Sequence, residues 1–143
     1  MINETSPEKQ YEFLTRDRNP SAVSPLSVIS GKSNAGKIEF YSTPLGTLVC
    51  AELTGMPESD GGGFDAYFLE IDGRKNASHI SGGRASYRTR TSNLPPVFTR
   101  CGKGKVSFMT DRFSVLDLVG RSIFLRRDGQ SVACGEILPC GRD

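Results

Sequence analysis

Short runs in which apolar and polar residues alternate make up most of this chain, and turn-forming residues separate the runs. Ile38 and Phe40, for example, alternate with Glu39 and Tyr41. Alternation with a period of two is typical of a β-strand with one buried face. The 143 residues include 16 glycines and 8 prolines, which suits many turns between short strands. The pattern predicts an all-β protein, and the length is that of one domain with a sizeable core.

Turn residues between pairs of strand-like runs predict three β-hairpins. Thr43–Gly46 has the proline and glycine that favour a type I turn, and Cys101–Gly104 is rich in glycine. Asp128-Gly129 favours the positive φ angles that a tight two-residue hairpin turn requires. The hairpins are predicted over Lys37–Leu53, over Val97–Phe98 with Val106–Thr110, and over Ile123–Leu125 with Val132–Cys134.

The run Phe64–Ile71 predicts a further strand with two distinct faces. One face carries Phe64, Ala66 and Phe68, and the other carries Asp65, Tyr67, Leu69 and Ile71. The polar stretch Asp72–Leu94 that follows is predicted to be a long loop, and Asp111–Leu118 to hold a brief helical turn. Together the runs predict about eight antiparallel strands in a β-sandwich or flattened barrel.

The N-terminal residues 1–24 differ from the rest in composition. They are polar, and their one apolar cluster is Tyr11, Phe13 and Leu14. We predict a leader over residues 1–24, partly disordered or docked on the body, and a β-sandwich domain over residues 25–143. The leader lacks the basic and apolar regions of a secretion signal, and no apolar stretch reaches the ~18 residues of a membrane span. We therefore expect a cytoplasmic protein.

Four cysteines and one histidine limit the metal and redox chemistry that the chain can perform. In a cytoplasm the cysteines are expected to be reduced and free. Cys50 and Cys134 lie in apolar strand runs and are predicted to be buried, whereas Cys101 lies in a turn and Cys140 is predicted to be exposed. No Cys-x-x-Cys pair occurs. His79 stands alone in the polar loop, so any site built from several histidines is excluded.

The net charge of +2 hides a strongly uneven distribution. Residues 1–73 carry 5 basic and 11 acidic groups, residues 74–127 carry 12 basic and 2 acidic groups, and residues 128–143 carry 1 basic and 3 acidic groups. A basic central segment attracts anions if its charges share one surface. The alternative is that strands from acidic and basic segments interleave, so that the charges offset one another in space.

Two segments near the C-terminus contain short motifs that bear on the fold. Val119–Leu125 contains Gly-Arg-Ser, and Val132–Ile137 contains Ala-Cys-Gly. Three more are Lys37–Pro57, Leu94–Phe98 and Phe108–Phe113. In this order the segments resemble the Cu/Zn superoxide dismutase family, the last two its bacterial branch. The resemblance implies a Greek-key β-sandwich. Because members of this family commonly form dimers, a homodimer or another protein partner is expected.

The family binds copper and zinc through histidines and one aspartate, and the resemblance assigns the corresponding positions in this chain. The former copper-ligand positions are Tyr67, Leu69, Arg84 and Arg126. The former zinc-ligand positions are Arg84, Tyr87, Arg90 and Asn93. None of these side chains supplies the imidazole or carboxylate that the family uses. The resemblance therefore implies a metal-free protein with no cofactor and no catalytic residue.

We expect a non-catalytic protein, in effect a pseudoenzyme, that acts as a binding or structural module. The alternative is a superoxide dismutase with an atypical metal site. Arg84, Arg90 and Arg126, which the resemblance brings together, are expected to form either an ion-pair cluster with nearby carboxylates or a pocket for small anions.

Nucleic-acid binding is the third function class, and it has the least support. The basic residues expected on one face for this function are Arg100, Lys103, Lys105, Arg121 and Arg127. Single-stranded nucleic acid also requires exposed aromatic rings on which bases can stack. The nearby aromatics alternate with polar residues and are predicted to belong to the core: Phe98, Phe108 and Phe124.

Overall fold

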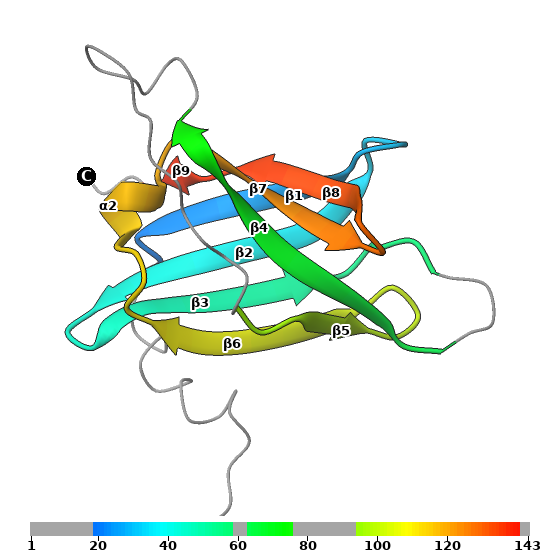
Figure 1. Cartoon of the computed structure of the whole chain (residues 1–143), viewed down its shortest axis with the longest axis horizontal. Helices are drawn as coiled ribbons and strands as arrows, with labels where there is room; N and C mark the ends of the chain where they lie inside the picture. The colour runs from blue at the N-terminus through cyan, green and yellow to red at the C-terminus, as the bar shows by residue number, and fades with distance from the viewer. Residues whose placement is uncertain (1–18, 59–62, 76–93, 141–143) are drawn as a thin grey trace, which may run out of the picture.

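Antiparallel strands make up most of residues 19–58, 63–75 and 94–140, the residues described by this computed structural model (Figure 1). The N-terminal half contains β1 (Ala22–Val28), β2 (Asn34–Thr43), β3 (Gly46–Leu53) and β4 (Asp65–Lys75). The C-terminal half contains β5 (Val97–Thr99), β6 (Gly104–Thr110), α2 (Val115–Leu118), β7 (Arg121–Arg127), β8 (Gln130–Glu136) and β9 (Leu138–Pro139). The prediction of an all-β fold is confirmed.

The strands follow one another around a nearly closed, flattened barrel in the order β5-β4-β7-β8-β1-β2-β3-β6, and β9 pairs with β1. Along the chain β4, β5 and β6 follow one another, and β7 then returns to pair with β4. This return is a Greek-key connection. In Figure 1 the green strand β4 crosses in front of β1, β2 and β3. This topology places β4 and β2 on opposite sides of the barrel.

Two of the three predicted hairpins form as antiparallel ladders. In the first, β2 and β3 pair continuously from Gly36 with Leu53 to Thr43 with Gly46. In the third, β7 pairs with β8, and the turn residues Asp128 and Gly129 have φ angles of 53° and 80°. These are the positive values that an Asp-Gly turn was expected to adopt, because glycine and aspartate tolerate them best.

The second predicted hairpin is only partly correct. Arg100 and Lys103 exchange backbone hydrogen bonds of 2.8 and 3.1 Å across a tight turn, but this is an isolated bridge. The strands on either side stay close but belong to different ladders, because β5 pairs with β4 and β6 pairs with β3. The turn therefore forms the seam at which the two ends of the sheet meet, rather than the tip of a ladder.

The barrel interior is filled by apolar side chains from the inward-facing positions of the strands. Six of the largest are fully buried: Phe40, Leu26, Ile38, Tyr67, Ile123 and Leu125. Their alternation with exposed neighbours is the pattern that predicted the strands. At one end, α2 caps the barrel, with Val115 and Leu118 buried and a capping box between Ser114 and Asp117. The predicted helical turn is confirmed.

Two predicted boundaries differ from the structure. The strand β1 begins at Ala22, which is fully buried, so the body of the barrel begins earlier than residue 25. Residues 1–18 of the predicted leader lie outside the described residues. The strand β4 continues to Lys75, four residues into the predicted loop, because it pairs with Arg121 beyond a bulge. Among the described residues, no helix has the length and apolar character to cross a membrane.

Candidate binding face

The former copper-ligand positions that the structure describes do not converge. Tyr67 and Leu69 point into the core and are 0% and 4% exposed. Arg126 pairs with Phe68 across β4 and β7, which puts it on the opposite, outer face of the sheet. Because side chains alternate along β4, a residue next to Tyr67 and Leu69 in sequence lies on the other side. Tyr67 and Leu69 therefore belong to the packing of the barrel.

Only one of the three proposed anion-binding arginines lies in the described residues. Arg126 forms an ion pair with Glu70 on the neighbouring strand and donates to the carbonyl oxygen of Gly129 at 3.0 Å. Both partners of the ion pair are more than a third exposed, so the pair contributes at most about 1 kcal/mol to stability. The other residues assigned to the former metal sites lie outside the described residues, as does the lone histidine: Arg84, Tyr87, Arg90, Asn93 and His79.

Tyr67 is the centre of a polar cluster at the inner side of β4. Its hydroxyl accepts a hydrogen bond from Arg127 at 2.8 Å and donates to the carbonyl oxygen of Pro57 at 3.1 Å. The Arg127 guanidinium lies 5.5 Å from the Tyr67 ring centroid and 3.8 Å from the Asp65 carboxylate. The cluster therefore satisfies a buried hydroxyl and a partly buried guanidinium together. Burial raises the pKa of Tyr67, although the Arg127 charge opposes this shift.

We expect the protein to lose stability as the pH rises above 10. Burial raises the pKa of Tyr67, and burial together with the Glu39 carboxylate raises the pKa of Tyr41, above the ordinary value of 10.0. Above pH 10 the phenols ionise in the unfolded chain, while the folded state still keeps them neutral. Ionisation therefore stabilises the unfolded chain and lowers the free energy of unfolding. Urea unfolding at successive pH values measures this fall. A Tyr41→Phe, Tyr67→Phe variant with an equally steep fall would contradict the assignment.

The four cysteines are unpaired in the structure, and none is fully buried. Cys50 and Cys134 occupy outward positions on β3 and β8, so the prediction that both are buried is wrong. The apolar runs around them are continuous, and such runs do not show which residues face the core. Burial still raises the pKa of the Cys50 thiol. Cys101 is exposed, whereas Cys140, which was predicted to be exposed, is partly buried.

Three phenylalanines, one just before β4 and one on the outer side of each of β4 and β5, are exposed to solvent. Phe64, Phe68 and Phe98 have 67%, 53% and 58% of their surface accessible. The register aligns Phe98 with Ala66, between the two phenylalanines of the β4 segment. The three rings therefore form one triangular group across two neighbouring strands, rather than separate exposed residues.

Basic residues lie at both ends of this group. The Arg100 guanidinium lies over the Phe64 ring, 5.2 Å from its centroid, and Lys103 is the bridge partner of Arg100. Arg126 is the cross-strand neighbour of Phe68. We call this surface the aromatic face, and it consists of Phe64, Phe68, Phe98, Arg100, Lys103 and Arg126.

The sequence predicted part of the aromatic face and missed part of it. The grouping of Phe64 and Phe68 on one side of β4, opposite Tyr67, is confirmed. The prediction that Phe98 belongs to the core is wrong, whereas Phe108 is buried as predicted. Arg121, expected on a basic face, is also buried, and its guanidinium donates to the backbone carbonyl oxygens of Asp117 and Asp72.

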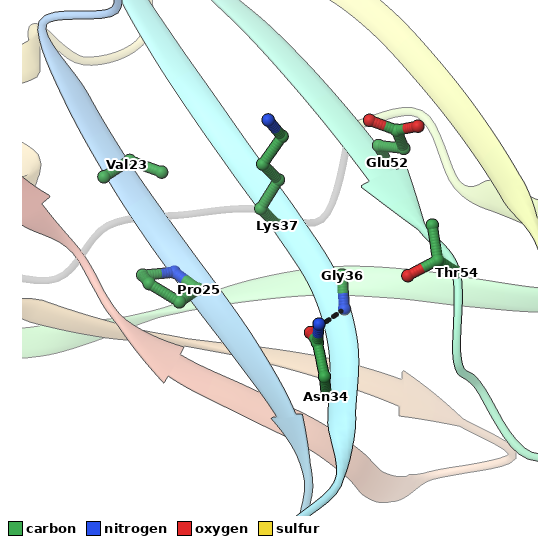
Figure 2. Close-up of a pocket in the computed structure, with 7 residues that line it drawn as sticks. All are labelled: Val23, Pro25, Asn34, Gly36, Lys37, Glu52 and Thr54. Atoms are coloured by element: carbon green, nitrogen blue, oxygen red, sulfur yellow. Dashed lines mark hydrogen bonds between the residues drawn. The ribbon is translucent and has the colours of Figure 1, made fainter.

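A shallow groove of about 380 Å³ lies elsewhere, on the outer side of β1, β2 and β3. Figure 2 shows Val23 and Pro25 on one side of Gly36, and Glu52 and Thr54 on the other. Its polar side chains are all exposed, so none is held in the buried, fixed position that orients a ligand. The groove is therefore a weaker candidate than the aromatic face.

No family model matches this chain, and no curated protein is significantly similar to it. In the described ranges, no three histidine, cysteine, aspartate or glutamate side chains gather as a potential metal site. The aromatic face is therefore the feature of the described residues that best supports a function.

Proposed function

We propose that this protein is a non-catalytic binding module, similar in architecture to the Cu/Zn superoxide dismutase family, and that the aromatic face is its binding surface. The observation that carries the proposal is the exposure of Phe64, Phe68 and Phe98 side by side. The former copper-ligand positions support it, because Tyr67 and Leu69 there serve the packing of the core.

The size of the exposed apolar surface favours a binding role. A phenylalanine can bury 150–250 Å², so three half-exposed rings leave roughly 300 Å² of aromatic surface in water. Patches of this size on soluble proteins are often functional, whereas scattered single apolar residues need no explanation. Aromatic and arginine side chains are also those enriched at the energetic centres of binding interfaces.

The anionic aromatic dye 1-anilinonaphthalene-8-sulfonate is expected to bind the aromatic face, with its rings on the phenylalanines and its sulfonate near an arginine. Phe68→Thr and Phe98→Thr should each remove most of the fluorescence enhancement. Both should leave the free energy of unfolding within about 1 kcal/mol of the parent, because threonine suits a strand and the rings are exposed.

Leu45→Thr is the matched control, because Leu45 is 76% exposed in the turn between β2 and β3, away from the aromatic face. It should leave dye binding unchanged. Equal dye binding by all four proteins would refute the proposed surface. Loss of stability in Phe98→Thr as large as that of a core substitution would show instead that the ring serves the fold.

A further inference from the structure

The spacing of the three rings on the aromatic face suits flat ligands bound in succession. Phe64 and Phe68 are four residues apart, which corresponds to roughly 13 Å along an extended strand. Phe98 lies opposite Ala66 on the adjacent strand, so its Cα is roughly 8 Å from each of theirs. All three rings project from the outer surface of the sheet, where a planar group can reach each of them.

The charges around the rings favour an anionic partner. Arg100 and Lys103 are exposed at one end of the group, and Arg126 lies at the other. Two carboxylates of β4 lie close to the phenylalanines in sequence: Glu70 is paired with Arg126, and Asp65 lies on the inner side of β4 near Arg127. Basic charge is thus concentrated at the Arg100 and Lys103 end of the rings, whereas the charge of Arg126 at the other end is offset by Glu70.

We infer that the aromatic face binds single-stranded nucleic acid, with bases stacked on the phenylalanines and phosphates contacting Arg100 and Lys103. This inference rests on the proposed function, since it names the partner of the same surface. Single strands expose the flat faces of their bases, and stacking on aromatic side chains combined with basic groups is a general way to hold them. A duplex hides those faces within its own stack, so it should bind more weakly.

The test is fluorescence anisotropy of a labelled oligothymidylate of about 12 nucleotides, a length that covers a small single-strand site. Phe98→Thr and Phe68→Thr should each weaken binding about tenfold or more. Arg100→Ala should also weaken it and reduce the slope of log affinity against log salt by about 0.7, the value expected for one lost phosphate contact on a single strand. A duplex of the same length should compete poorly.

Two controls keep the result specific. Lys37→Ala removes an exposed lysine on β2, on the opposite side of the barrel, and should leave the affinity and the salt slope nearly unchanged. Leu45→Thr removes an exposed apolar residue far from the rings and should do the same. If Lys37→Ala weakens binding as much as Arg100→Ala, the oligonucleotide is held by diffuse charge, and the inference is wrong.

The dye experiment distinguishes a failure of the nucleic-acid inference from a failure of the proposed function. Dye binding that depends on Phe98, without oligonucleotide binding, would overturn the inference and leave the proposed function standing. Absence of both would overturn both. Sedimentation velocity supplies the remaining outcome: a dimer that Phe98→Thr dissociates and that oligothymidylate does not would identify a second copy of the chain as the occupant, and would also overturn the inference.

Discussion

Tyr67→Ala is expected to lower the free energy of unfolding by about 4 kcal/mol, which is within the range for removing a buried aromatic ring. Tyr67 is fully buried in the core, so the truncated side chain leaves a cavity that the surrounding strands cannot readily fill. The Arg127 guanidinium also loses both its hydroxyl acceptor at 2.8 Å and the ring beneath it. Urea unfolding followed by circular dichroism would measure the loss.

Tyr67→Phe separates the ring from the hydroxyl. It keeps the packing and removes only the hydrogen bonds to Arg127 and Pro57, so it should cost about 1–2 kcal/mol. The expected order is therefore a small loss for phenylalanine and a large loss for alanine. If alanine costs no more than phenylalanine, the side chain does not fill the core as described.

Gly104→Ala is expected to cost about 3 kcal/mol and to open the seam of the barrel. A Cβ atom at Gly104 would lie 2.0 Å from the carbonyl oxygen of Phe98, and backbone rather than a movable side chain occupies this space. The strands β5 and β6 would have to separate, and β5 carries one ring of the aromatic face. The variant should therefore lose both stability, measured by urea unfolding, and dye binding.

Gly63→Ala is the matched control for this substitution. Gly63 immediately precedes Phe64, and a Cβ there would meet no heavy atom within 4 Å. The same change of residue should leave the free energy of unfolding within about 0.5 kcal/mol of the parent. Equal losses at Gly63 and Gly104 would show that the close approach of β5 and β6 is not what makes Gly104 sensitive.

Local patterns were sufficient to predict those parts of the barrel that depend on neighbours in the sequence. Alternation over Phe64–Ile71 identified the two faces of β4, and the Asp-Gly dipeptide identified the turn between β7 and β8. Both depend on the intrinsic geometry of a strand or a turn. The β5–β6 connection was harder, because its glycine-rich turn is the same whether the strands pair with each other or with other strands.

The candidate site depended on information that a single strand does not contain. The strand β5 has three residues, too few for alternation to show that Phe98 points outward. The pairing of Arg126 with Phe68 depends on the register between β4 and β7, which are distant in sequence. The resemblance placed Tyr67 and Arg126 in one cluster, and the register places them on opposite faces.

The position of β1 also bears on how the chain is synthesised. This strand is hydrogen-bonded to β2, which follows it directly, but also to β8 and β9, where Val28 pairs with Ala133 and Ala22 with Pro139. In a nascent chain, one edge of β1 therefore stays unpaired until β8 and β9 have been synthesised. Because pairing between such distant strands is slow and an open edge invites aggregation, the emerging polypeptide should depend on chaperones more than the finished protein does.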